Sequence, residues 1–358
     1  IHTAIEETSP YEDYNENVVN WSGVLYDCAN VSLDYKVAKL DFPTPCDMRA
    51  PGAATGLPAI ESALDELSYK LKIDPLALRL KNYAYDDQVT GKPFSSKELK
   101  ACFEQGAEKF GWSKRNPEPR STKEGSNLIG WGMATGIWDA QQSQASASAK
   151  LRADGKLEVS SCTADIGTGT YTVMTQIAAE VMGLPLDDVT FNLGDSDLPQ
   201  SPVEGGSWTV SSNGSAVKMV CEAIKKEVFK LTRKMNDSPF ADAEYEGVIF
   251  ADGEIKSKTD ASKSVSIFEA MRREEIESIE EETKSTPDKL RQSKYTMSVH
   301  SAVFVEVKVD EDLGTIHVTR VVSAIAGGRV INPKTARSQI LGAVVWGIGQ
   351  ALHEESIV

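Results

Sequence analysis

Paired cysteines, clustered histidines and long apolar runs are all missing from this sequence of 358 residues. The four histidines show neither HxH nor HExxH spacing, so we expect no metal held by side chains. No apolar run reaches the roughly 20 residues that cross a bilayer. The five cysteines include no CxxC pair and none of the spacings that hold iron–sulfur clusters, so reduced, partly buried thiols are expected at Cys28, Cys46, Cys102, Cys162 and Cys221.

Positive charge is also scarce, because 38 lysines and arginines face 53 aspartates and glutamates, for a net charge of −15. This balance argues against nucleic acid or an anionic membrane as a partner. The sequence contains no GxGxxG fingerprint for a dinucleotide and no P-loop lysine. The length of the chain favours two domains rather than one core.

The two ends of the sequence suggest a piece of a longer polypeptide. The first residues do not begin with Met and lack the basic start and apolar core of a signal peptide. The last residues, GIGQALHEESIV, stop inside an apolar pattern of helical spacing without a glycine stop. We therefore expect a fragment.

Helices dominate the first third of the chain. Apolar residues at helical spacing predict a helix over 57–71, with Thr55 or Gly56 as its cap. The Asp-Pro pair at 74–75 predicts the start of a second helix, because aspartate caps well and proline suits the first helical position.

A third helix is expected shortly before the sequence changes from helical patterns to a polar stretch. Ser95 or Ser96 is its expected cap, and its apolar face leads into a polar stretch rich in Pro, Ser and Gly over 115–127. We place the domain boundary in this stretch, which divides the chain into 1–120 and 121–358.

Alternating strands appear in the second part of the chain. Two hairpins are expected over 145–165 and 301–325, with helices over 171–183 and 212–235 between them. The charged run over 271–289 is interpreted as a solvated helix end followed by a mobile loop. A final helix is expected after Asn332 or Thr335, and the fold class is α+β, with mixed sheets and antiparallel hairpins packed by helices.

Two turns rich in small residues precede helices and are candidates for binding an anion. In DIGTGTYT, backbone N–H groups and hydroxyls suit a phosphate, although an ordinary capped helix start has the same pattern; the residues concerned are Gly167, Thr168, Gly169 and Thr170. In SPVEGGSWTVSSNGSA, many donors with little bulk favour a polyanionic ligand, with a serine-rich linker as the alternative; the residues concerned are Gly205, Gly206 and Ser207.

Two further segments carry single polar groups in apolar or small surroundings. Gln339 and Gln350 lie on the glycine-rich final helix, where each amide must bond either to the main chain or to a ligand. Arg49 stands in CDMRAPGAATG, where small neighbours would let a bulky anion approach a guanidinium with five donors. A surface salt bridge is the alternative role for this arginine.

These four segments, in the order in which they follow one another along the sequence, resemble the large molybdenum-cofactor subunit of the xanthine dehydrogenase and aldehyde oxidase family. CDMRAPGAATG with ESALDELSYKLKIDPLALRLKNY resembles that subunit's arginine loop and the helix pair after it. DIGTGTYTVMTQIAAE, GGSWTVSSNGSAV and GRVINPKTARSQILGAVVWGIGQALHEE resemble its later cofactor segments. The resemblance runs over nearly the whole chain and is closest to the bacterial three-subunit type.

The resemblance implies two molybdopterin-binding domains: the C-terminal part of the first over 1–120, and the N-terminal and central part of the second over 121–358. It implies a molybdopterin dinucleotide, in the cytosine form, whose dithiolene holds the metal, so that the protein supplies no metal ligand. The implied reaction is oxidative hydroxylation of an aldehyde or a xanthine-like N-heterocycle with water. Electrons would pass to 2Fe-2S and FAD subunits or domains in a dimer of heterotrimers.

Site residues are carried over from the resemblance position by position. Arg49 matches the arginine beside molybdenum and substrate, where it would stabilise developing negative charge. Gln339 matches a glutamine that bonds the cofactor. The turn residues match cofactor-lining positions, although Thr168 stands where the family often has glutamine; they are Gly167, Thr168, Gly169, Thr170, Gly205, Gly206 and Ser207.

Two family features have no counterpart in these 358 residues. The catalytic glutamate follows the final helix in the family, and Glu354 and Glu355 lie ahead of that position. The glycine-rich segment that faces the molybdenum apex is also missing. We therefore expect this chain alone to be inactive. A non-catalytic cofactor-binding or assembly-type relative is the alternative function, and the compartment is expected to be cytoplasmic, with periplasmic co-export on a partner left open.

Overall fold

The computed structural model describes residues 2–11, 14–41, 43–355 and 357. The chain forms two compact units: unit 1 contains Ile1–Ala140, Lys289–Arg329 and Ile340–Val358, and unit 2 contains Gln141–Asp288 and Val330–Gln339. Most of unit 2 is therefore an insertion in the sequence of unit 1, between two strands that are paired there.

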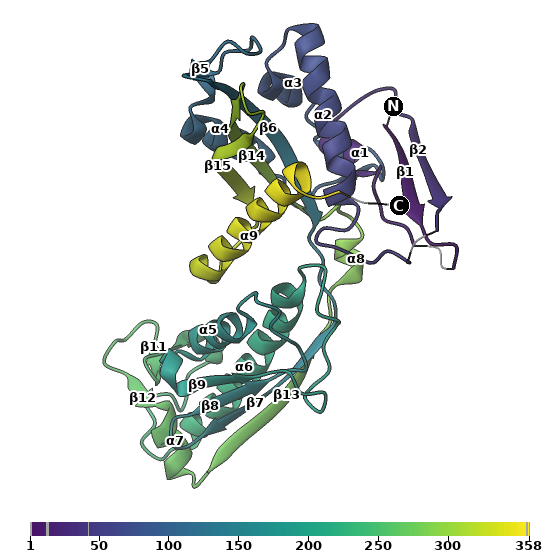
Figure 1. Cartoon of the computed structure of the whole chain (residues 1–358). Helices are drawn as coiled ribbons and strands as arrows, with labels where there is room; N and C mark the ends of the chain where they lie inside the picture. The colour runs from purple at the N-terminus through teal and green to yellow at the C-terminus, as the bar shows by residue number, and fades with distance from the viewer. Residues whose placement is uncertain (1, 12–13, 42, 356, 358) are drawn as a thin grey trace. The chain divides into compact units, whose positions relative to one another are not determined.

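Unit 1 contains most of the helices of the first half of the chain and the longest strands (Figure 1). Its elements are β1 (His2–Thr8), α1 (Trp21–Leu25), β2 (Leu33–Lys39), α2 (Ala53–Leu71), α3 (Pro75–Lys81), β3 (Asp86–Asp87), β4 (Lys92–Pro93), α4 (Leu99–Phe110), β5 (Lys123–Glu124), β6 (Asn127–Asp139), α8 (Lys289–Gln292), β14 (Ser298–Asp310), β15 (Ile316–Ala326) and the part of α9 (Pro333–Leu352) from Ile340 onward.

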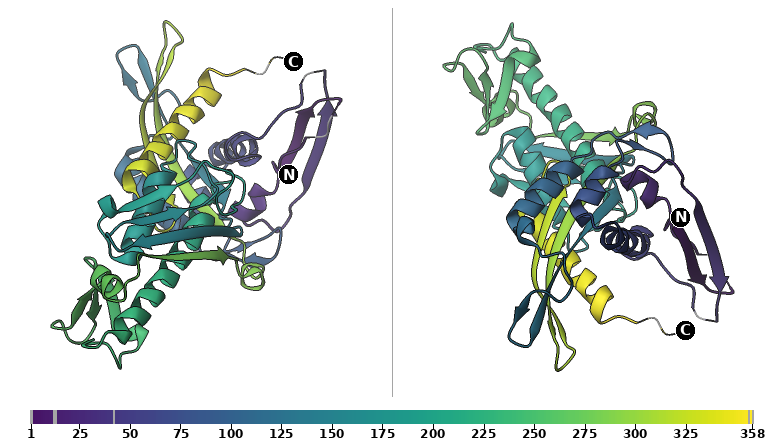
Figure 2. Two further views of the ribbon diagram at one scale, coloured as in Figure 1. Left: turned by 90° about the horizontal axis from the view of Figure 1, so that it is seen from below. Right: turned by 90° about the horizontal axis from the view of Figure 1, so that it is seen from above.

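The core of unit 1 lies on an antiparallel sheet with strand order β15-β14-β6-β5. The register pairs His300 with Ile137 and Phe304 with Met133, so that these four side chains share the buried face of the sheet. Helix α4 packs on β14 and β15, and its fully buried Phe103 belongs to the same hydrophobic cluster as Met133 and Phe304. Strands β1 and β2 form a separate parallel pair at the border of the unit (Figure 2).

Helix α2 lies along β6 and is tied to it by a buried carboxylate. Glu61 accepts the backbone N–H of Thr135 at 2.8 Å and the Nε–H of Arg79 at 2.8 Å. The Tyr26 hydroxyl also donates to Glu61. The carboxylate therefore satisfies a strand N–H that the helix would otherwise leave buried without a partner.

Unit 2 is built on a four-stranded sheet with order β13-β7-β8-β9, in which only the β8–β9 pair is parallel. Its elements are β7 (Ala145–Arg152), β8 (Leu157–Ser160), α5 (Thr170–Met182), β9 (Val189–Asn192), α6 (Thr209–Lys234), β10 (Val248–Ala251), β11 (Glu254–Ser257), β12 (Ser264–Ser266), α7 (Ile267–Arg273), β13 (Ser278–Ser285) and the start of α9.

One face of this sheet carries the core of unit 2. Every second residue of β7 is buried, and α5 and α6 lie side by side over that face (Figure 1). Helix α6 packs on β7 and β13, and α5 packs on β9. Among the residues that the structure describes in both units, no helix is both long and apolar enough to cross a membrane.

The predicted α+β class, with mixed sheets and antiparallel hairpins packed by helices, is confirmed. Both hairpins form, as β7–β8 and β14–β15, and α9 begins after Asn332, whose Oδ1 accepts the backbone N–H groups of Lys334 and Thr335 at 3.0 and 3.2 Å. The Asp74 side chain caps α3 as expected.

Two caps and one loop were predicted wrongly. Helix α2 begins at Ala53, ahead of Thr55 and Gly56, and α4 begins after Glu98, beyond both expected serines. The charged run over 271–289 is not a mobile loop: it contains β13, an edge strand paired with β7. Glutamates are compatible with an edge strand because its charged side chains remain in water and discourage pairing with other chains.

Candidate functional site

The arginine loop of unit 1 is held by a carboxylate from a distant segment. Glu16 Oε2 accepts the backbone N–H of Gly52 at 2.7 Å and the hydroxyl of Thr55 at 3.0 Å, at the start of α2. No side chain caps α2 at its N-cap residue, Gly52; the Glu16 carboxylate accepts the N–H of that residue and lies where the helix dipole favours negative charge. Gly52 has φ +76°, and a Cβ there would lie 2.4 Å from Asn17 O, so only glycine fits.

A tyrosine hydroxyl joins both sides of the same loop. Tyr14 Oη lies 2.9 Å from Glu16 Oε1 and 2.8 Å from Asp47 Oδ1. Burial, together with these two carboxylates, raises the pKa of Tyr14, so the phenol stays a donor. Residues on either side of Arg49 are therefore fixed, while the Arg49 side chain itself is exposed.

Helix α9 approaches the arginine loop within unit 1. The guanidinium carbon of Arg49 lies 5.5 Å from the centre of the Trp346 ring. One turn of helix further on, Gln350 Nε2 donates to Ala54 O at 3.2 Å, which is the main-chain partner that the sequence left open for this amide.

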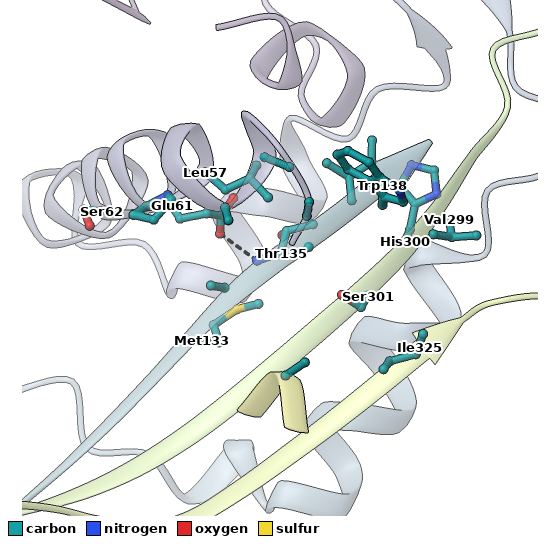
Figure 3. Close-up of a pocket in the computed structure, with 18 of the residues that line it drawn as sticks. Leu57, Glu61, Ser62, Met133, Thr135, Trp138, Val299, His300, Ser301 and Ile325 are labelled. Atoms are coloured by element: carbon teal, nitrogen blue, oxygen red, sulfur yellow. Dashed lines mark hydrogen bonds between the residues drawn. The ribbon is translucent and has the colours of Figure 1, made fainter. Parts of the chain in front are cut away.

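A cavity of about 620 Å³ lies beside the same helices in unit 1 (Figure 3). Glu61, Thr135 and His300 supply polar groups to walls that are otherwise mainly apolar. Burial raises the pKa of Glu61 although Arg79 acts in the opposite direction, and burial lowers the pKa of His300 to about 3. None of the site residues predicted from the sequence lines this cavity.

The first predicted turn of unit 2 already holds an anion from the chain itself. Asp165 Oδ1 accepts the N–H groups of Gly167 at 2.9 Å and Gly169 at 3.1 Å. Burial acts to raise the pKa of Asp165, but these N–H donors prevail and leave it below the usual value. A phosphate would therefore meet the hydroxyls of Thr168 and Thr170, which lie 3.0 Å apart, rather than these two N–H groups.

Gln339 lies against this turn within unit 2. Its Nε2 donates to Gly167 O at 2.9 Å, so the structure brings together two segments that are far apart in the sequence. The contact is reinforced where Thr335 of α9 approaches the backbone of Gly169: a Cβ on that glycine would lie 2.5 Å from the threonine methyl.

The second predicted turn of unit 2 is organised around another carboxylate. Glu204 accepts the hydroxyls of Thr163 at 2.7 Å and Thr209 at 2.8 Å, which ties the turn to the end of β8 and to the start of α6. Gly206 and Ser207 both have positive φ, of 58° and 64°. Their backbone is therefore held in a compact turn at the start of the helix.

An unsatisfied amide lies one helical turn beyond this loop. Asn213 is 1% exposed, and its Nδ2 donates to Ser161 Oγ at 2.8 Å. Its Oδ1 is buried and has no partner within the described part of the chain. A buried amide oxygen without a donor is costly, by about 1–3 kcal/mol, which favours a ligand or an ordered water there.

The donors of unit 2 suit a large, phosphorylated cofactor rather than a bare metal. Thr168, Thr170, Ser207 and Gln339 offer hydroxyl and amide groups beside glycines with little bulk. The carboxylates of Asp165 and Glu204 each accept two internal donors, which partly offset their negative charge toward an anion. No three histidine, cysteine, aspartate or glutamate residues among those described are grouped in a way that could hold a metal ion.

Sequence reasoning missed the residues that brace these turns. Asp165 could have been found, since an aspartate two residues before glycine is typical of an Asx turn. Glu16 and Trp346 could not, because each reaches the arginine loop from a remote part of the sequence.

Comparison with known families finds two matches to molybdopterin cofactor-binding domain models, over residues 2–83 and 105–358. The aldehyde oxidoreductase molybdenum-binding subunit PaoC of Escherichia coli (strain K12) is 38% identical over 347 residues, which cover 96% of this chain and 45% of that protein. The putative xanthine dehydrogenase molybdenum-binding subunit XdhA of the same strain is 26% identical over 372 residues, covering 99% and 48%.

Solved structures share the fold. Quinoline 2-oxidoreductase from Pseudomonas putida 86 has a TM-score of 0.85 at 18% identity, covering 99% of this chain and 48% of that one. Aldehyde oxidoreductase from Desulfovibrio desulfuricans ATCC 27774 has a TM-score of 0.72 at 19% identity, covering 97% and 37%. The chain thus spans about half the length of the relatives it matches or less, and it belongs to the molybdopterin cofactor-binding domains of the xanthine dehydrogenase and aldehyde oxidase family.

Proposed function

We propose that this chain is part of a molybdenum hydroxylase that converts an aldehyde or an N-heterocycle to its hydroxylated product. The reaction takes its oxygen from water and releases two protons and two electrons. The observation that carries the proposal is the match over 105–358 to a cofactor-binding model, in a region where Gln339 is bonded to the first polar turn, at Gly167.

The cofactor proposed is a molybdopterin dinucleotide in its cytosine form. When bound, it supplies a molybdenum centre that accepts electrons from the substrate. The residues that we propose to surround it are those of the two turns and one residue of α9: Gly167, Thr168, Gly169, Thr170, Gly205, Gly206, Ser207 and Gln339. The N–H groups of Gly167 and Gly169 are bonded to Asp165, so these two glycines would provide space rather than donors. Asn213 Oδ1, buried and without a partner among the described residues, is a further acceptor for a cofactor amine.

Arg49 is proposed to act on the substrate. A guanidinium keeps its charge at every working pH and can stabilise negative charge that develops on a carbonyl oxygen or a ring nitrogen. The bracing of its loop by Glu16 and Tyr14 supports this role, because a preorganised charge reduces the reorganisation needed during reaction.

Electrons are proposed to leave through 2Fe-2S and FAD subunits or domains, in a dimer of heterotrimers in the cytoplasm. Relatives described as molybdenum-binding subunits, and one described as the gamma subunit of a dehydrogenase complex, support a partner-dependent enzyme. The division into parts of two cofactor domains at 1–120 and 121–358 remains a proposal. So does the inactivity of the 358-residue chain by itself.

The test is hydroxylation by the complete subunit that contains this sequence, with its partners, supplied with ¹⁸O-labelled water and an artificial electron acceptor. Incorporation of ¹⁸O into an aldehyde or heterocycle, lost on Arg49→Met, supports the proposal. Bound molybdenum without turnover would instead favour a non-catalytic relative. Turnover by the isolated 358-residue chain would overturn the proposed inactivity.

A further inference from the structure

Trp346 of α9 and the exposed arginine of unit 1 form a pair that the family match does not explain. The Arg49 guanidinium carbon lies 5.5 Å from the centre of the indole ring, within the range at which a cation is attracted to an aromatic face. The indole is 48% exposed, so it is not there to fill a core.

Gly342 completes the contact. It precedes Trp346 by four residues, so both lie on one face of the helix, one turn apart. A Cβ on Gly342 would lie 3.7 Å from Arg49 Nη1, so the guanidinium occupies the space above this glycine, beside the ring. A larger side chain there would displace the guanidinium.

The backbone of the arginine loop is fixed independently of the contact between Arg49 and Trp346. Glu16 holds Gly52, and Tyr14 contacts Asp47, so the backbone on both sides of Arg49 is restrained by groups that do not touch the guanidinium in these contacts. What the backbone leaves undetermined is the direction of a long, flexible side chain. A flat aromatic surface restricts that direction because the guanidinium is planar and stacks well.

We propose that Trp346 is a positioning residue for Arg49: the indole face and the notch at Gly342 orient the guanidinium toward a negatively charged or electron-rich group of the substrate. The contact stands on the geometry alone, whereas its effect on catalysis rests on the function proposed above.

The contact is tested in the 358-residue chain, without cofactor, by NMR of the arginine Nε–Hε groups, with the Arg49 signal assigned from Arg49→Lys. The indole ring current should shift this signal upfield. Trp346→Leu should abolish the shift, Trp346→Phe should retain part of it, and the neighbouring Val345→Ala should leave it unchanged. A signal that is the same in wild type and Trp346→Leu would overturn the proposal.

The consequence for catalysis is tested in the complete subunit with its partners. Loss of one exposed cation–π contact should lower kcat/KM by about threefold to fivefold in Trp346→Leu. Trp346→Phe should recover most of the activity, and Gly342→Leu should match Trp346→Leu. If the NMR shift is present but Arg49→Met itself leaves turnover unchanged, the proposed function of Arg49 fails while the contact stands. Equal kcat/KM in wild type and Trp346→Leu, with Arg49→Met inactive, would overturn the positioning role.

Discussion

Replacing Arg79 by methionine should destabilise unit 1 more than any surface change. Arg79 is fully buried and donates to Glu61 through Nε at 2.8 Å and to Asp65 through Nη1 at 3.0 Å. Methionine fills part of the volume but leaves the Glu61 carboxylate without its charge partner. Breaking a buried pair on one side costs about 3–5 kcal/mol, so we expect a loss of that size in the free energy of unfolding.

The same variant should show a specific dependence on pH. Burial already raises the pKa of Glu61, and Arg79 opposes that rise. A carboxyl whose folded pKa lies above its unfolded value contributes stability at low pH and loses it as the pH rises through the folded pKa. Without Arg79 the folded pKa rises further, so the loss of stability should be greater at about pH 8 than at about pH 5.

Tryptophan fluorescence during urea unfolding measures this effect selectively. Of the six tryptophans, only Trp208 belongs to unit 2, and Trp208→Phe removes it from the signal. Arg120→Met is the matched control, because Arg120 is 72% exposed where it pairs with Glu311 and should contribute less than about 1 kcal/mol. A loss below about 1 kcal/mol in Arg79→Met, equal at both pH values, would refute the reasoning.

Three further substitutions test other parts of unit 1. Gly52→Ala should lower the free energy of unfolding by more than about 1 kcal/mol, because its Cβ would lie 2.4 Å from Asn17 O. Gly125→Ala, also at positive φ but with open space around it, should lose less. Equal losses in urea unfolding would contradict this. Lys97→Met should lower the free energy of unfolding by about 1–3 kcal/mol, because Lys97 Nζ donates to two main-chain carbonyls at 2.9 and 2.8 Å. Unchanged thermal unfolding would contradict this prediction. Burial lowers the pKa of His300 to about 3, below its unfolded value. Between about pH 7 and pH 4.5 the free energy of unfolding of the wild type should therefore fall by about 2–3 kcal/mol more than that of His300→Phe. Parallel acid-unfolding curves for the two proteins would contradict this.

Local patterns in the sequence predicted the elements well. Both hairpins follow from alternation around turn residues, and α5 ends at Gly183 in a left-handed conformation, as its glycine stop indicates. The cap of α3 follows from the Asp-Pro pair at 74–75. These features depend on neighbours in the sequence, so a single sequence contains enough information to predict them.

Long-range contacts were the part that the sequence could not predict. The N-cap of α2 is Gly52, and no spacing rule links it to Glu16, whose carboxylate accepts its N–H. Residues 271–289 look solvated because their charges do face water, yet backbone pairing with β7 makes part of them a strand. The pairing of β6 with β14 across the whole insertion is likewise invisible to local periodicity.

For the candidate site too, local patterns could be read from the sequence and long-range contacts could not. The turns at 165–170 and 205–207 were proposed from their small residues, and Gln339 was proposed from an amide on an apolar helix. That Asp165 already occupies two N–H groups of the first turn required the structure, as did the donation from Gln339 to Gly167. The hydroxyls and amides thereby become the expected cofactor contacts.

The most direct test of the account is molybdenum and pterin analysis of the complete subunit that contains this sequence, comparing wild type with Gln339→Leu and with Gln350→Leu as the matched control. We expect about one molybdenum and one pterin per wild-type chain, a clear loss of both in Gln339→Leu, and full occupancy in Gln350→Leu. A wild-type subunit that binds neither, or a Gln339→Leu variant that stays fully loaded, would contradict it.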